Sequence, residues 1–130
     1  MNTSKARILI VDDEPKWGRN SKLALEERGY IVEWVQSMKE AYDHASRERF
    51  ALVVINSALA FAEGTSPLKR IVRRHPRSVI ILSDVHSVAV AVEAFKVGAD
   101  YEDKPFEISN LVNLVDRLIC SLRTESVSAA

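Results

Sequence analysis

The fold is decided near the N-terminus by the stretch ILIVDDEP, which spans residues 8–15. Four branched aliphatic residues are followed by two aspartates, a glutamate and a proline. An apolar run of this kind suits a strand that is buried on both faces of a parallel sheet. Proline suits the first turn of a following helix, and glycine commonly closes one. Residues 7–11 are therefore predicted to form a strand, and the segment from Pro15 to Gly29 a helix with its closing glycine.

The same alternation of strand and helix continues along the chain. Further strands are predicted at residues 30–35, 50–55, 79–82 and 100–102, and helices at residues 37–49, 67–75, 87–97 and 107–122. Ser37 and Glu40 form a capping box, Ser66 is the expected cap of the helix at 67–75, and residues 57–66 are predicted as a loop. Five strand–helix units predict an α/β fold, a (βα)5 doubly wound five-stranded parallel sheet with helices on both faces.

Length and composition are typical of one globular domain. Residues 1–123 are predicted to form it, and residues 124–130, small and polar, a flexible tail or the start of a linker. Eighteen basic residues balance 18 acidic ones, so no net charge attracts nucleic acid or membrane. No apolar stretch approaches the roughly 20 residues of a spanning helix, and Cys120, the single cysteine, is typical of a reducing compartment. We expect a cytoplasmic protein without a membrane partner.

Polar side chains stand where the predicted strands end. Asp12 and Asp13 follow the first strand, Asn56 the third and Ser83 the fourth, and Lys104 comes just after the fifth. The carboxyl ends of parallel strands line one edge of the sheet, where open α/β folds place their ligand sites. Each residue taken alone would suit an ordinary structural role, but the set of four strand ends indicates a site. With an aspartate at position 56 it would suit a divalent metal and phosphoryl transfer; with Asn56 the nucleophile is missing.

Several segments together carry a resemblance to a known family. They are ILIVDDEP and residues 50–60, 79–83 and 91–106, the last including Gly98-Ala99-Asp100-Tyr101 and Lys104-Pro105-Phe106. The chain resembles, over residues 6 to about 122, the receiver (REC) domain of two-component response regulators, with the CheY-like fold and its flavodoxin-like topology. In such domains a histidine kinase donates a phosphoryl group to an aspartate at the end of the third strand. That position is Asn56 here.

The resemblance implies a metal site at this edge of the sheet. Asp12 and Asp13 match the family's metal-binding acids, and the backbone carbonyl of Ala58 would be the third protein contact to Mg²⁺. Asn56 removes one negative charge from this set. Mg²⁺ binding is therefore expected to be weakened.

The resemblance also implies the residues of a switch. Ser83 matches the hydroxyl that engages the phosphoryl group, and Lys104 matches the basic residue that contacts it. Tyr101 matches the aromatic residue whose rotamer reports activation. A cis bond between Lys104 and Pro105 is implied as well, and it would direct the ammonium into the pocket.

Three features depart from the family pattern. Asn56 carries an amide, which is a poor nucleophile and should not be phosphorylated. Asp84 stands beside the phosphoryl entrance, where the family usually has a small residue; it either replaces part of the lost charge or points to solvent. Residues 57–65 lack the usual Met-Pro-Gly character. The chain is thus either a natural pseudo-receiver or an ordinary receiver with an engineered inactivating change. Asp84 and the atypical segment 57–65 favour the natural version. Deamidation of Asn56 before Ser57, which would regenerate an aspartate, is a third alternative.

The partners expected are proteins. The helix Val88–Val97 is apolar nearly all round and, with Tyr101, predicts a homodimer face. The basic segment 69–77 is interpreted as the solvated side of an amphipathic helix, so no direct nucleic-acid contact is expected of this domain. The other expected partners are a histidine kinase or another signalling protein, and a C-terminal output domain in a longer protein. No enzyme is expected: a flavodoxin-like nucleotide-binding enzyme is a more distant alternative, because an acidic loop after the first strand would repel phosphate.

Overall fold

The computed structural model describes residues 6–129, with the backbone alone described for residues 123–129. Its strands are β1 (Arg7–Val11), β2 (Ile31–Val35), β3 (Leu52–Asn56), β4 (Val79–Ser83) and β5 (Asp100–Asp103). Its helices are α1 (Pro15–Glu27), α2 (Met38–Arg47), α3 (Ser57–Ala60), α4 (Ser66–Arg74), α5 (Val88–Val97) and α6 (Ile108–Ala129).

The five strands form one parallel sheet in the order β2-β1-β3-β4-β5. This arrangement confirms the predicted doubly wound (βα)5 sheet. Strand β1 lies between β2 and β3, so the chain first winds toward one edge and then reverses toward the other. The reversal places the ends of β1 and β3 side by side, which is where such folds bind ligands.

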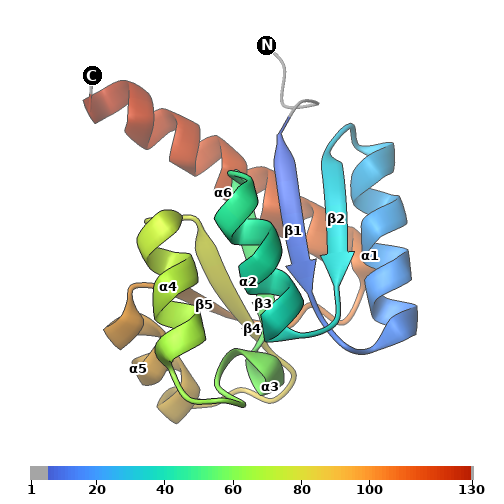
Figure 1. The fold of residues 1–130 in the computed structure, drawn as a ribbon. Coiled ribbons are helices and arrows are strands. Elements are labelled where there is room, and N and C mark those ends of the chain that lie inside the picture. Colours follow the sequence, from blue (N-terminus) through green and yellow to red (C-terminus); the bar gives the residue numbers. More distant parts are fainter. Residues whose placement is uncertain (1–5, 130) are drawn as a thin grey trace.

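Helices cover both faces of the sheet (Figure 1). On one face Leu25 of α1 and Leu111 of α6 pack with Ile10 and Val54 of the strands. On the other face, α2, α4 and α5 pack against the alternate strand residues; their buried members include Met38, Ala41, Leu68, Ile71 and Ala94. Both faces of the central strands are therefore removed from water, as the uninterrupted apolar runs predicted. In the part of the chain that the structure describes, no helix has the length and hydropathy to span a bilayer.

The predicted helix starts can be checked at their hydrogen bonds. Ser37 Oγ accepts from the Glu40 backbone N–H at 3.1 Å, and the Glu40 carboxylate reaches back to the Gln36 N–H at 2.8 Å. The first bond confirms Ser37 as the cap of α2, which begins at Met38, whereas the second goes to Gln36, one residue before the position that the predicted capping box requires. Ser66 was wrongly expected as a cap: α4 begins with Ser66 itself, behind Thr65, which makes no side-chain cap bond.

Two segments differ from the sequence prediction. The predicted loop at 57–66 begins with a helix of four residues, α3, whose first turn is capped by the side chain of Asn56. Helix α6 ends at Ala129 and not at Leu122, because no glycine or proline interrupts the sequence between these two residues. Most of the predicted tail is therefore helical in its backbone. That it begins a linker stays a prediction.

Candidate functional site

Asp12 is the centre of the polar cluster at the carboxyl edge of the sheet. It follows β1 directly and is buried. Its Oδ2 accepts from the Lys104 ammonium at 2.7 Å and from the Asn56 amide nitrogen at 3.1 Å. Its Oδ1 accepts from the backbone N–H of Glu14 at 2.9 Å. Both carboxylate oxygens therefore have protein donors, which satisfies a buried charge that would otherwise be costly.

Asn56 uses both ends of its amide. The nitrogen donates to Asp12, and Oδ1 accepts from the Ala58 N–H at 3.0 Å, which caps α3. The opposite amide orientation would set an oxygen against the Asp12 carboxylate and an NH₂ group against an N–H. The neighbours thus fix one orientation. An aspartate in this position could accept from Ala58 but would have no donor for Asp12.

Lys104 reaches the cluster from the residue after β5. Its backbone N–H donates to the Ser83 carbonyl at 2.7 Å, which extends the pairing of β5 with β4 by one residue. Its side chain is 9% exposed, and the ammonium lies 3.4 Å from Asp84 Oδ1 and 4.2 Å from the centre of the Trp17 ring. The expected cis bond to Pro105 is wrong: no described peptide bond is cis. In the trans form, which costs less for any X-Pro bond, the ammonium already reaches Asp12.

Two contacts beside Asp12 were not predicted. The Trp34 indole N–H donates to the backbone carbonyl of Asp12 at 2.9 Å. The same ring lies directly on Gly18 of α1, where an added Cβ would come within 2.1 Å of it. A glycine inside a helical pattern is a signal of such a close approach, because it otherwise costs stability there. Trp34 and Gly18 together hold the start of α1 against β2.

Ser83 and Tyr101, two other predicted site residues, make their contacts away from Asp12. Ser83 Oγ donates to the Val85 carbonyl at 2.5 Å, within its own loop. The Tyr101 hydroxyl accepts from the Ser87 N–H at 2.9 Å and donates to Asp103 at 3.2 Å. Asp13 is exposed at the rim of the cleft that Asn56, Ala58, Asp84 and Lys104 also line. The structure thus brings Asp12, Asn56, Lys104 and Asp84 together, while Ser83 and Tyr101 face a neighbouring loop.

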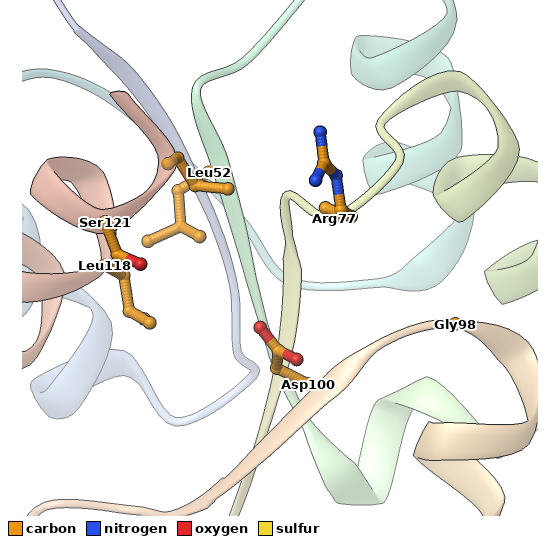
Figure 2. A pocket seen from close by; sticks show the side chains of 7 residues that line it. Leu52, Arg77, Gly98, Asp100, Leu118 and Ser121 are labelled. Carbon is orange, nitrogen blue, oxygen red and sulfur yellow. The ribbon is translucent and has the colours of Figure 1, made fainter. Parts of the chain in front are cut away.

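A second cavity lies at the other end of the sheet. Figure 2 shows its lining, which includes Leu52 at the start of β3, Asp100 at the start of β5, and Leu118 and Ser121 of α6. Arg77, also in the lining, has a positive φ of 63° in the turn before β4. Asp12, Asn56, Asp84 and Lys104 do not line this cavity.

Comparison with known proteins decides the family. The family model described as the response regulator receiver domain matches residues 8–116. The chain belongs to the response regulator receiver domain family. Its curated relatives include the transcriptional activator protein IrlR of Burkholderia pseudomallei (strain 1026b), 34% identical over 114 residues that cover 87% of this chain and 50% of that protein. The transcriptional regulatory protein PcoR of Escherichia coli is 30% identical over 124 residues, 94% of this chain and 55% of that protein. This receiver domain spans about half the length of these relatives.

Solved receiver structures agree with the fold. A CheY-like receiver domain protein from Methanospirillum hungatei JF-1 superposes with a TM-score of 0.82 at 29% identity, covering 92% of this chain and 98% of that one. A response regulator protein from Burkholderia pseudomallei with a phosphorylated aspartic acid, calcium ion and citrate gives a TM-score of 0.75 at 25% identity, covering 94% and 73%. The relatives of this receiver domain are signalling regulators, and receiver domains generally pair with histidine kinases and bind Mg²⁺.

The side chains of this receiver domain do not fit the Mg²⁺ that the family implies. Each carboxylate oxygen of Asp12 is directed at a protein donor, and Asp13 is exposed. Within the residues whose side chains are described, no three Asp, Glu, His or Cys side chains are placed to share a metal ion. Mg²⁺ needs oxygen ligands that are free to face it. The amide NH₂ of Asn56 and the ammonium of Lys104 occupy Oδ2 of Asp12 instead, and the backbone N–H of Glu14 occupies Oδ1.

Proposed function

We propose that this receiver domain acts as a regulatory module through protein contacts and does not accept phosphate. The observation that carries the proposal is Asn56, the last residue of β3. By the family resemblance it stands where the acceptor aspartate would be. Its amide oxygen bonds the Ala58 N–H and its nitrogen bonds Asp12, so neither atom is available for chemistry.

The chemistry of the side chain supports the proposal independently of its contacts. Acyl-phosphate formation needs a carboxylate that attacks in line, with its charge balanced by a cation. An amide has no such charge, and its nitrogen lone pair is delocalised. The contact between Asp84 and Lys104 supports a natural pseudo-receiver, because it is a second adjustment at the same site.

The direct test is phosphorylation by a small-molecule phosphodonor in the presence of Mg²⁺, read by intact mass. We expect no phosphoryl adduct on the wild-type chain, and an adduct on Asn56→Asp if the rest of the pocket is competent. Asn110→Asp, the same change at an exposed position of α6, is the matched control and should stay unmodified. An adduct on the wild type would overturn the proposal. The mass before treatment also shows whether Asn56 has deamidated.

The interaction surface in this proposal is α5. Val88, Val92 and Phe95 are exposed, Phe95 to 82%, and one turn of the helix separates the neighbouring members of this apolar stripe. We propose that the stripe and Tyr101 form a homodimer contact, with a histidine kinase or another signalling protein as a further partner and an output domain in the full-length protein. A cytoplasmic location belongs to the same proposal.

Sedimentation velocity tests the dimer. The wild type should sediment faster than Phe95→Glu at high micromolar concentration, because a charge within an apolar interface is costly to bury. The exposed polar change Lys96→Gln on the same helix is the control. A wild-type monomer at that concentration contradicts the dimer without affecting the proposal on phosphate.

A further inference from the structure

The ammonium of Lys104 lies inside a small cage of groups that attract a cation. Asp12 Oδ2 is 2.7 Å from Nζ, Asp84 Oδ1 is 3.4 Å from it, and the centre of the Trp17 ring is 4.2 Å from it. The distance and placement over the ring are those of a cation–π contact. Three separate elements therefore contribute to the cage: the segment after β1, the loop after β4, and α1.

The charges of the buried side chains of this pocket are balanced, whereas Asp84 is 60% exposed. Asp12 is buried with one negative charge, Lys104 has one positive charge and Asn56 has none. An aspartate at position 56 would leave one uncompensated negative charge, and a divalent cation would then be needed to neutralise the pocket. Asp13, Asp84 and Glu14 stand at the exposed rim, where water and salt screen their charges. With Asn56 the buried part of the pocket is neutral without a metal.

We propose that the Lys104 ammonium is the resident cation of this pocket and stands in place of the divalent metal. The inference rests on the proposed function only in taking Asn56 as the native residue of the acceptor position. Its consequence is regulatory: the ion pair of Lys104 with Asp12 would link the segment after β5 to the end of β1 whether or not Mg²⁺ is present. The pocket of this receiver domain should then be insensitive to Mg²⁺.

Trp17 and its contact with the ammonium supply a spectroscopic probe. The test is a Mg²⁺ titration, with no phosphodonor, that records tryptophan fluorescence and the thermal unfolding midpoint. The wild type should shift by less than about 1 °C and keep its emission at about 10 mM Mg²⁺. Lys104→Gln should gain about 3–6 °C and change its emission, since a ligand that binds the folded state alone raises the midpoint.

Matched variants separate the charge of the ammonium from the general effect of changing a lysine. Lys104→Arg keeps a cation in the pocket and should stay insensitive, whereas Lys96→Gln makes the neutral change at an exposed lysine of α5 and should behave as the wild type. Trp17→Phe should reduce the emission change in the Lys104→Gln background to the contribution of Trp34, whose N–H bonds the Asp12 carbonyl, and should leave the midpoint gain.

The outcomes are decisive in both directions. A wild-type midpoint that rises with Mg²⁺, or a Lys104→Gln variant that gains nothing, overturns the proposal. If Lys104→Gln is unfolded without Mg²⁺, folding on its addition supports the proposal and failure to fold overturns it. None of these experiments uses phosphate, so their results are independent of the phosphorylation test. A wild type that binds Mg²⁺ yet accepts no phosphoryl group would overturn the proposal on Lys104 and leave the proposed function intact.

Discussion

Replacing Asn56 by aspartate should destabilise the metal-free domain, even though the two side chains have nearly the same shape. The amide nitrogen is 3.1 Å from Asp12 Oδ2, and both residues are buried. The change removes a hydrogen bond to a charged acceptor, worth about 1.5–3 kcal/mol. It also places a second carboxylate oxygen at the same distance from the first.

The size of the effect follows from these contacts. Two like charges about 3 Å apart repel by roughly 5 kcal/mol at an effective dielectric constant of about 20. Attraction of the new carboxylate to the Lys104 ammonium offsets much of that. We expect a net loss of about 2–4 kcal/mol in the free energy of unfolding at pH 7, or about 8–16 °C in the midpoint for a domain of this size.

Urea and thermal unfolding in the presence of a chelator measure this loss. Asn110→Asp should change the unfolding free energy by no more than about 0.5 kcal/mol, as exposed substitutions usually do. Millimolar Mg²⁺ should restore part of the stability of Asn56→Asp, because the added carboxylate completes a charge set that a divalent cation can neutralise. If Asn56→Asp is as stable as the wild type without a divalent cation, the assigned contact between Asn56 and Asp12 is incorrect.

Three further changes test the packing that supports the site. His75 is 2% exposed and its Nε2 accepts from the Phe50 N–H at 3.1 Å; burial above all lowers the pKa of His75 below 6.5. As the pH falls, the unfolded chain takes up the proton before the folded one. The free energy of unfolding should therefore be at its full value above about pH 6.5 and fall by at most about 1.4 kcal/mol per pH unit below it. His75→Gln should reduce this pH dependence, measured by urea unfolding, and an unchanged slope would show that His75 is not its source. Gly18→Ala should lose about 1–3 kcal/mol in urea unfolding, because its Cβ would meet the Trp34 ring at 2.1 Å, although alanine favours a helix by about 1 kcal/mol; a more stable variant would show that the ring moves aside freely. Leu25→Ala removes a fully buried side chain and should cost about 2–5 kcal/mol in the same assay, whereas a loss below about 1 kcal/mol would place this residue outside the core.

The sequence predicted that Asp12, Asn56 and Lys104 lie close together, because this prediction required only that the strands run parallel. Continuous apolar runs predict central parallel strands, and their polar last residues must then share one edge. The same reasoning gave the strand bounds to within about two residues, the uncertainty usual for element ends. For Asp84 the sequence allows two states, and the structure contains parts of both: its side chain is 60% exposed, yet one oxygen lies 3.4 Å from Lys104 Nζ.

What the sequence did not predict depends on contacts between separate elements. The short helix α3 has too few residues for a periodic pattern, and its cap is the side chain of Asn56. The stacking of Trp34 on Gly18 joins β2 to α1, and neither residue marks the other in the sequence. The bond before Pro105 is trans, and the Lys104 ammonium still lies 2.7 Å from Asp12 Oδ2, a distance that the sequence does not contain. Each of these features follows from packing geometry, which strand and helix periodicity does not contain.

Helix α6 runs on to Ala129 and extends past the end of the sheet in Figure 1. A continuous helix turns by about 100° and advances by about 1.5 Å with each residue. Whatever is attached beyond it in a longer protein would therefore be held at an angular phase set by residue count. A rotation of the domain would be transmitted along α6, because the helix is continuous from residue 108 to residue 129. Inserting one residue would point the attached part in a different direction, and inserting seven would restore it nearly to its starting phase.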